Sequence, residues 1–439
     1  MNTKYWTLNP AQLIVSVFAL CAMAGTVLLK LPIATEDGVS WIDAAFLSTS
    51  AITVTGLASV DPGSTFTLFG EIVLMFLMQI GGIGVMCYAV LIYVLIGKRI
   101  KFKERLLIQQ ALNQNSLGGV IRLARSVLIY SFVIEAAAAL LLSIRLVPEY
   151  GFGQGLYYSL FHSISAFNNA GLALWSDGLM GFVGDPVMNI VITMLFIFGG
   201  LGFTVIADLI YAKRFRQLSL HSKMMITGTF VINIVAMFVI FFLEFNNEGT
   251  LAPLSLWEKA AASYFQGVSP RTAGFNTVDI SAIEDPTAFF MMMLMFIGAG
   301  STSTGGGIKL TTFLILLLAA ITFIRGKKDT VIFRRRLQET TIMKALAIAV
   351  TSLLFICMAI FLLTIFEERD FLPLAFEVIS AFGTVGLSMG VTPELSVIGK
   401  LIIMFIMFLG NIGPLTLAYT LAKPDQQKIR YPQEDVLTG

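Results

Sequence analysis

Long apolar runs recur along this chain and set the first limit on its fold. Windows of about 19 residues place eight such runs at 12–30, 68–96, 120–147, 187–211, 224–243, 287–324, 342–366 and 396–422. Hydrophobic residues make up 56% of the 439 residues and charged residues only 13%, which leaves too little polar surface for a water-soluble globule of this size. The sequence therefore predicts an all-α polytopic membrane protein with eight transmembrane helices.

A shorter, half-apolar segment lies between the two runs of each successive pair. These segments are 41–52, 154–167, 254–268 and 371–382. Each is too short to cross a hydrocarbon core of about 30 Å at a rise of 1.5 Å per residue. They are predicted to be re-entrant half-helices. Ser40 and Ser255, each followed three residues later by an acidic residue, have the pattern of helix caps.

A run of small residues ending in glycine follows each half-helix. The glycines Gly56, Gly171, Gly274 and Gly386 are 115, 103 and 112 residues apart, which indicates an internal repeat. Each of four pseudo-repeats is then a span, a re-entrant pore half-helix, a filter strand and a second span, all around one central pore. The expected boundaries are 1–105, 106–216, 217–336 and 337–422, followed by a cytoplasmic C-terminal tail at 423–439.

Basic residues predict the orientation of the chain. They cluster in 98–105, 213–223 and 325–336, whereas the opposite connections are mainly acidic. By the positive-inside rule, the basic loops and both termini are cytoplasmic in a multi-pass cell-membrane protein, and the half-helices enter from outside. Their partially negative C-terminal ends then face the membrane interior, where they favour a cation over an anion. The net charge of +2 is distributed in these short clusters, which argues against a nucleic-acid partner.

The glycine motifs have the composition of a carbonyl-lined ion filter. Non-helical backbone at membrane depth must be buried in protein or line a water-filled cavity. Four such strands supply rings of carbonyl oxygens that replace the hydration shell of a cation, and glycine permits close approach and a positive φ. The candidate filter residues are Thr53, Val54, Thr55, Gly56, Asn168, Asn169, Ala170, Gly171, Arg271, Thr272, Ala273, Gly274, Gly383, Thr384, Val385 and Gly386.

The sixth apolar run contains a glycine-rich stretch, 298–309. As one helix the run would be about 57 Å long, nearly twice the hydrocarbon thickness, so a break at the glycines is expected. A flexible loop there could obstruct the pore as a gate; the alternatives are a close helix-packing site of small residues or a phosphate cradle, although the order of a P-loop is missing. The gate candidates are Gly298, Gly300, Ser301, Thr302, Ser303, Thr304, Gly305, Gly306, Gly307 and Lys309.

Enzymatic chemistry is not indicated. The sequence offers no nucleophile–base set, paired-carboxylate site or metal cluster, so an enzyme is not expected, nor a bound metal or cofactor beyond the transported ion. Isolated polar residues in the spans, such as Glu135 and Glu377, leave a proton-relay pump as one alternative. His162 and His221 are interpreted as structural or surface residues. A coupled secondary transporter of another small solute or cation, such as sodium, also uses broken helices and is the second hypothesis.

The four motifs, with the run from Ser303 to Lys309, closely resemble the Trk/Ktr/HKT superfamily of potassium transporters. The resemblance covers nearly the whole chain and is nearest to the KtrB/KtrD-type membrane subunit of bacterial Ktr systems. It implies potassium uptake through one pore per subunit, with 298–309 as the gating loop. It also implies a homodimer in the lipid bilayer on a cytosolic ring of nucleotide-binding regulatory subunits of the KtrA or KtrC type, and sodium stimulation in several members.

Two positions qualify what the resemblance implies. Serine in place of the first-repeat glycine goes with sodium transport in the superfamily, so Gly56 favours potassium. The last span of the family typically carries a basic residue just before its I-G-P-L-T motif, whereas this chain has Asn411 before Ile412. The family's account of the permeation barrier and of gating therefore does not transfer directly to Asn411.

Overall fold

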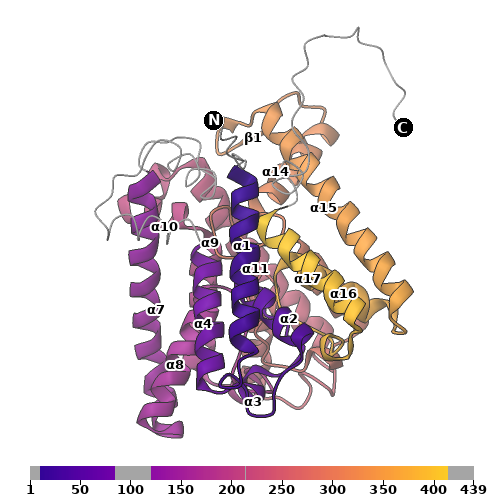
Figure 1. The fold of residues 1–439 in the computed structure, drawn as a ribbon. Coiled ribbons are helices and arrows are strands. Elements are labelled where there is room, and N and C mark those ends of the chain that lie inside the picture. The colour runs from indigo at the N-terminus through magenta and orange to yellow at the C-terminus, as the bar shows by residue number, and fades with distance from the viewer. Residues whose placement is uncertain (1–9, 85–119, 213, 414–439) are drawn as a thin grey trace, which may run out of the picture.

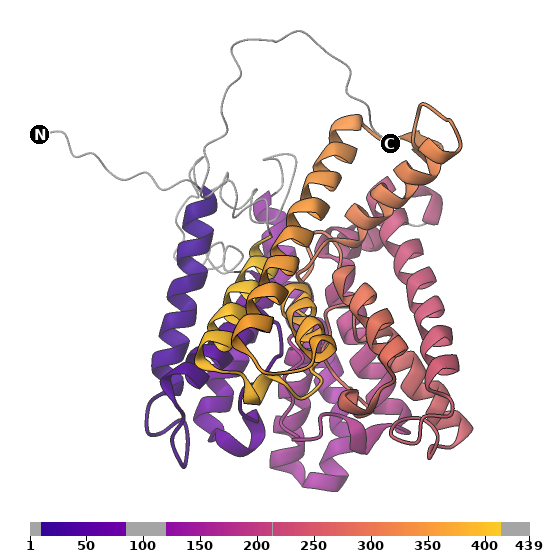
Figure 2. The same cartoon turned by 90° about the vertical axis from the view of Figure 1, so that its right-hand side faces the viewer.

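The computed structural model describes residues 10–84, 120–212 and 214–413, which are almost entirely helical (Figures 1 and 2). The α-helices of the first half are α1 (Pro10–Leu29), α2 (Trp41–Ile52), α3 (Pro62–Thr65), α4 (Leu68–Ile83), α7 (Val120–Tyr150), α8 (Phe152–Phe167), α9 (Pro186–Leu201) and α10 (Phe203–Tyr211). Those of the second half are α11 (Leu220–Glu244), α12 (Leu256–Val268), α13 (Asp285–Phe296), α14 (Leu310–Ile324), α15 (Glu339–Phe366), α16 (Phe371–Gly383) and α17 (Val397–Ile412).

Short 3-10 turns join some of these helices. They are η1 (Met180–Phe182), η2 (Phe215–Gln217), η3 (Ile280–Ala282) and η4 (Thr392–Glu394). The helices form four successive units, α1–α4, α7–α10, α11–α14 and α15–α17. The predicted boundary at 105–106 and the tail at 423–439 lie outside the described residues.

The four predicted half-helices are present as α2, α8, α12 and α16. The two predicted caps are also confirmed. The side chain of Ser40 accepts a hydrogen bond from the Asp43 backbone N–H, and Ser255 forms a reciprocal capping box with Glu258. Such contacts satisfy N–H groups that the first turn of a helix leaves without partners, so the start of these half-helices is fixed by local sequence.

The second helix of three units ends or bends at a glycine. The span predicted at 187–211 is bent, because α9 and α10 meet at Gly202 at an angle of 95°. The helices α4 and α17 likewise end at Gly84 and Gly413. All three glycines have φ between 88° and 98° with ψ between 131° and 140°, a region open almost only to glycine. The predicted continuations to 96 and 422 lie outside the described residues.

The predicted break in the sixth run is confirmed. Helix α13 ends at Phe296 and α14 begins at Leu310, and the backbone between them is not helical. Its two ends are held together, because Ile297 and Ile308 form a parallel β-bridge. The loop thus leaves one helix and returns to the other at nearly the same point.

Three helices in the described part of the chain are long and apolar enough to cross a membrane, namely Ala124–Tyr150, Leu220–Glu244 and Glu339–Phe366, and the bent pair α9–α10 makes a fourth if counted as one span. The count of eight spans stays a prediction. The chain is mostly helical, in line with the predicted all-α class, and one loop carries a short hairpin in which β1 (Val331–Ile332) pairs with β2 (Arg335–Arg336). Positive φ angles at Phe333 and Arg334 form the tight turn of this hairpin.

The units are arranged in a closed cycle. The second helix of each unit packs against the half-helix of the next: α4 against α8, α9 against α12, α13 against α16, and α17 against α2. The half-helices supply six of the largest fully buried side chains, Phe46, Phe161, Phe167, Phe265, Phe376 and Phe382. They are therefore the centre of the fold, surrounded by the longer helices.

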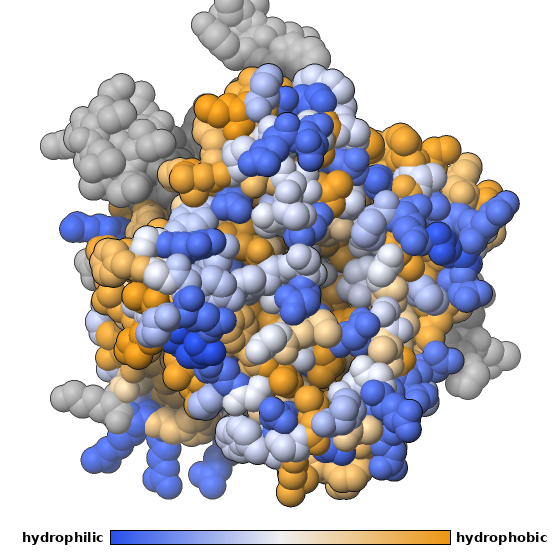
Figure 3. Space-filling view, turned by 90° about the horizontal axis from the view of Figure 1, so that it is seen from below, coloured by the Kyte–Doolittle hydropathy of each residue, from blue (hydrophilic) through white to orange (hydrophobic). Residues whose placement is uncertain are grey.

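The two ends of the cycle differ. The half-helices begin near the lower end in Figure 1, and the hairpin lies at the upper end with α14 and α15. Seen from below, hydrophilic side chains are spread over the lower face among hydrophobic ones (Figure 3). Such a mixed face is suited to water rather than to the hydrocarbon of a bilayer.

Candidate functional site

The four predicted glycines, here called the ring glycines, close a ring in which each unit contacts the next. A Cβ atom built on each ring glycine would collide with a carbonyl oxygen of the following unit. The separations are 2.4 Å from Ala170 for Gly56, 2.8 Å from Ala273 for Gly171, 2.1 Å from Val385 for Gly274, and 2.3 Å from Thr55 for Gly386. No side chain fits at such distances, so only glycine allows the ring to close.

Backbone conformation repeats around the ring. The residue two positions before each ring glycine has a positive φ: 48° at Val54, 57° at Asn169, 75° at Thr272 and 49° at Thr384. The ring glycines also have positive φ, whereas the residues between do not. This alternation can turn successive carbonyl groups toward the same side of a strand. Left-handed Val and Thr cost about 1–3 kcal/mol each and occur mostly at functional sites.

Four serines anchor the ring to the half-helices. The Gly56 and Gly386 N–H groups donate to the hydroxyls of Ser50 and Ser380 at 3.0 and 3.1 Å. The hydroxyls of Ser165 and Ser269 instead donate to the carbonyls of Leu172 and Phe275. The sequence-based search did not select these serines. Their signal was present, since three of them stand six residues before a ring glycine and the fourth stands five before.

Two of the residues three positions before the ring glycines have side chains that bond to neighbouring helices. The Asn168 amide donates to Gln79 on α4 and to the Glu135 carboxylate on α7, at 2.8 and 3.1 Å. The Arg271 guanidinium donates to Asn233 and Thr229 on α11. These two predicted filter residues therefore have their side chains engaged with neighbouring helices. Asn168 and Arg271 can therefore present only their backbone carbonyl groups to an ion. Gly383, the corresponding residue of the fourth unit, has no side chain.

The loop 297–309 contacts three of the four units at the ring. The Gly306 N–H donates to the Thr384 hydroxyl at 2.8 Å, and a Cβ on Gly305 would lie 2.3 Å from Thr272 Oγ1. Asn169 bonds to Thr272 at 2.8 Å and faces the Thr304 hydroxyl at 3.3 Å. The loop thus lies against the left-handed residues of the second, third and fourth units.

The remaining gate candidates hold the loop in place. The Lys309 ammonium donates to the Gly305 carbonyl at 2.6 Å, and Ser303 donates to Gly300. The backbone of the loop bonds to neighbouring helices through Gly300 with Gly200, Thr302 with Phe203 and Gly307 with Gly410. Gly298 bonds to Ile308 across the base, and Ser301 pairs with Thr311. All ten candidates therefore belong to one connected loop.

The first unit receives a different partner. Asn411, on α17, donates from its side-chain amide to the Thr53 carbonyl at 3.0 Å. The Thr53 and Thr55 hydroxyls are 2.8 Å apart. Asn411 thus contacts the first unit, whereas the loop contacts the other three.

Three further glycines let the second helices approach the half-helices. A Cβ on Gly81, Gly199 or Gly410 would lie 2.0 Å from a carbonyl oxygen near the end of a half-helix, at Ile52, Phe167 and Phe382 respectively. Sequence reasoning missed these contacts. The available signal was a repeated G-x-x-G spacing, 81–84, 199–202 and 410–413. The third unit differs, because its Gly298 lies against Gly306 of its own loop.

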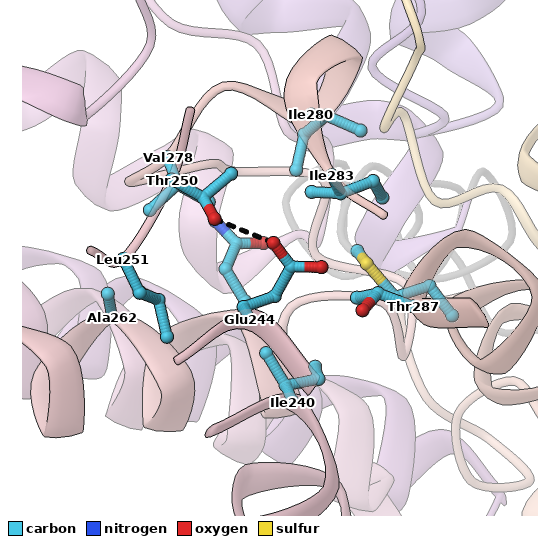
Figure 4. A pocket seen from close by; sticks show the side chains of 11 residues that line it. Ile240, Glu244, Thr250, Leu251, Ala262, Val278, Ile280, Ile283 and Thr287 are labelled. Carbon is cyan, nitrogen blue, oxygen red and sulfur yellow. Dashed lines mark hydrogen bonds between the residues drawn. The ribbon is translucent and has the colours of Figure 1, made fainter. Parts of the chain in front are cut away.

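Other polar groups lie behind the half-helices. The described residues contain no group of three or more His, Cys, Asp or Glu side chains placed to hold a metal ion. Figure 4 shows a cavity behind α12 lined mainly by apolar side chains, with Glu244 bonded to Thr250. Glu244 also accepts from Asn247 and the Glu284 N–H, so its carboxylate joins two loops.

Four similar units close into a ring of backbone contacts, and the sequence family of the chain indicates what kind of protein has this arrangement. Residues 7–431 match the TrkH family, described as cation transport protein. The chain belongs to this family.

Relatives match over nearly the full length. The chain is 55% identical to the Ktr system potassium uptake protein B of Bacillus subtilis (strain 168), covering 99% of this chain and 98% of that protein. It is 46% identical to the protein of the same name from Vibrio alginolyticus, covering 98% and 94%. It is 35% identical to the potassium/sodium uptake protein NtpJ of Enterococcus hirae, covering 98% of each.

The fold is also found in a solved structure. The crystal structure of the potassium transporter TrkH from Vibrio parahaemolyticus superimposes with a TM-score of 0.77, covering 96% of this chain and 87% of that chain at 18% sequence identity. The likeness confirms the helical fold of the chain.

Proposed function

We propose that this protein takes up potassium across the cell membrane through the ring, which serves as a carbonyl-lined selectivity filter. The observation that carries the proposal is the closure of the ring by four glycine–carbonyl contacts, from Gly56 to Ala170 and on to Gly386 and Thr55. Rings of carbonyl oxygens replace the hydration shell of an alkali cation. The negative ends of four half-helices add a field that favours cations.

Potassium is the ion that the relatives favour. Two proteins named for potassium uptake share 55% and 46% of their residues with this chain. The name of the relative from Enterococcus hirae includes sodium as well, which supports sodium as a second transported or stimulating ion. Glycine at all four ring positions favours the potassium function over sodium uptake alone.

The loop 297–309 is the proposed gate. It contacts the left-handed residues Asn169, Thr272 and Thr384, so it lies where an ion leaving the ring would pass. Five glycines between 298 and 307 give its backbone the freedom to rearrange. Its many bonds to neighbouring helices support a closed state that a partner protein opens.

The proposed partners are a second copy of this chain and a cytosolic regulatory subunit of the KtrA or KtrC type. Support comes from the words "Ktr system" in the names of relatives. The basic hairpin around Arg334 and Arg335 lies at the end of the molecule opposite the starts of the half-helices (Figure 1). The positive-inside rule then makes that end cytoplasmic.

The test is rubidium uptake in cells that lack their own potassium transport, with the regulatory partner present. Uptake above that of empty-vector cells is expected, with stronger competition by potassium than by sodium or caesium. Absence of uptake, with the protein present in the membrane, would overturn the proposal. Competition by sodium as strong as by potassium would favour the second candidate.

A further inference from the structure

The residue nine positions before each ring glycine is buried behind the ring. From one unit to the next, this residue alternates between apolar and ionisable. The four residues are Leu47, His162, Phe265 and Glu377, and all have 0% of their surface exposed. The first and third are apolar and the second and fourth are ionisable. Because the units follow one another around the cycle, the two polar residues stand on opposite sides of the ring.

Glu377, on α16, ties down the segment that follows its ring glycine. Its carboxylate accepts a hydrogen bond from the Ser388 hydroxyl at 2.8 Å and another from the Thr392 hydroxyl. Ser388 in turn accepts from the Gly390 N–H at 3.1 Å, and its hydroxyl oxygen lies 3.1 Å from that of Thr392. None of the ion pairs in the described part of the chain includes Glu377. A buried carboxylate is costly unless such bonds satisfy it.

His162, on α8, does the same in the second unit. Its Nδ1 bonds to the Tyr158 carbonyl at 2.8 Å, so this nitrogen carries the proton. Nε2 is then the acceptor for the Leu174 N–H at 3.3 Å. The imidazole of His162 also stacks on the indole of Trp175, with ring centroids 4.1 Å apart. Leu174 lies three residues after Gly171, and Ser388 lies two residues after Gly386. In both units the buried polar side chain therefore bonds to the segment that follows the ring glycine.

We propose that Glu377 and His162 are positioning residues, which fix the backbone on the entry side of the filter from two opposite units. This inference rests on the proposed function, because it assigns these side chains to ion selection. They touch no ion themselves. Each joins the middle of a half-helix to the segment after its ring glycine, 387–392 or 172–175, so that the glycine is held from both sides. In the other two units apolar packing at Leu47 and Phe265 fills the same place.

The reason for two hydrogen-bonded positions lies in the stiffness that a filter needs. Carbonyl oxygens repel one another when no cation lies between them, and apolar contacts alone give little directional restraint. A hydrogen bond has a preferred distance and angle, so it resists displacement of the segment that it holds. Two such bonds on opposite sides restrain the width of the ring.

The experiment compares Glu377→Leu with Glu377→Gln and uses the full chain with its regulatory partner. Leucine is the residue that the first unit has at this position and accepts no hydrogen bond, whereas the glutamine oxygen still does. The expected result is at least a fivefold loss of potassium preference over sodium, in competition of rubidium uptake, for Glu377→Leu. Less than a twofold loss is expected for Glu377→Gln. A merely structural role would lower the amount of protein and the maximal rate without changing the preference.

His162→Leu and His162→Gln form the second pair, since the glutamine side-chain oxygen can accept from Leu174. Ser159→Ala, on the same half-helix, is the matched control, because Ser159 is buried and bonds only within α8 to Gly155. The control is expected to keep the wild-type preference. If Glu377→Leu fails to accumulate, the pair Ser388→Ala and Thr392→Val removes the same bonds and is expected to give the same loss.

Unchanged potassium preference in both leucine variants would overturn the inference. So would an equal loss in Glu377→Leu and Glu377→Gln, because charge rather than hydrogen bonding would then be decisive. These results require a wild-type protein that takes up rubidium in competition with potassium. A wild-type protein without that uptake refutes the proposed function itself, so the two failures are distinct.

Discussion

The side-chain amide of Asn411, on the last helix, donates a 3.0 Å hydrogen bond to the backbone carbonyl of Thr53 in the first unit. This contact joins two parts of the sequence that lie at opposite ends of the chain. It also places a neutral side chain at a position where the resemblance described above implies a basic one. The charge at position 411 is therefore open to direct test.

Asn411→Lys is expected to reduce rubidium uptake at least tenfold. Two unit charges about 4 Å apart interact by about 4 kcal/mol near a protein surface, so an ammonium group beside the Thr53 carbonyl opposes a passing cation. Asn411→Ala removes the hydrogen bond without adding charge and is the control; it is expected to retain most of the uptake. Initial rates at low and high salt measure the effect. Equal rates for the lysine and alanine variants would contradict a role of charge.

Gly274→Ser and Gly386→Ser are expected to weaken the preference for potassium over sodium by about tenfold. The added Cβ would lie 2.1 Å from the Val385 oxygen in one case and 2.3 Å from the Thr55 oxygen in the other. Overpacking of this kind costs about 1–3 kcal/mol, which the ring can relieve only by widening. Competition of rubidium uptake by the two ions gives the preference.

Gly151→Ser is the matched control for these ring variants. Gly151 has a φ of 82° and open space around its missing side chain, so backbone strain is similar but no collision occurs. The control should keep the wild-type preference. If Gly151→Ser loses as much potassium preference as the ring variants, backbone strain at a positive φ, rather than contact between units, causes the loss.

Deleting residues 300–306, or replacing Lys309 by methionine, is expected to raise uptake in cells without the regulatory subunit. The Lys309 ammonium bonds to the Gly305 carbonyl at 2.6 Å, and a bond from a charged group contributes about 1.5–3 kcal/mol. Its loss should raise the open fraction about tenfold. Lys344→Met, which removes an exposed lysine on α15, serves as control. Unchanged uptake in the deletion variant would favour a helix-packing role for the loop.

Lys400→Met is expected to lower stability more than the double variant Asp43→Asn with Lys400→Met. The Lys400 ammonium lies 2.8 Å from the Asp43 carboxylate, with side chains only 10% and 16% exposed. This pair joins α17 to α2. Removing one partner of a buried pair costs about 3 kcal/mol or more, because the other charge is left uncompensated. The apparent melting temperature in detergent measures this, and equal values for the single variant and the wild type would refute it.

The half-helices and their glycines were predictable because local rules specify them. The half-helix segments are too short to cross a bilayer, and Ser40 and Ser255 mark the N-terminal ends of two of them. The break at 297–309 follows from a run too long for one span. In each case the information lies within about 40 consecutive residues. The assignment of these residues to a filter and a gate remains a prediction.

The bend at Gly202 and the helix ends at Gly84 and Gly413 were not predicted, because single glycines are common in membrane helices. Only the contact between Gly199 and the Phe167 carbonyl shows why the second helix bends where it does. The same holds for Glu377, whose partners at 388 and 392 become visible only when the segment folds back over the half-helix. Such features depend on tertiary contacts rather than on local pattern.

The ring closes only when the glycine of the last unit reaches the carbonyl of the first, Gly386 against Thr55. During biosynthesis, a nascent chain that has delivered three units to the bilayer still has an open side. Under the proposed function, the filter therefore forms only after the fourth unit has been synthesised. We expect a chain truncated before the fourth unit to lack the closed ring, and therefore to lack the selective path that the proposed function requires.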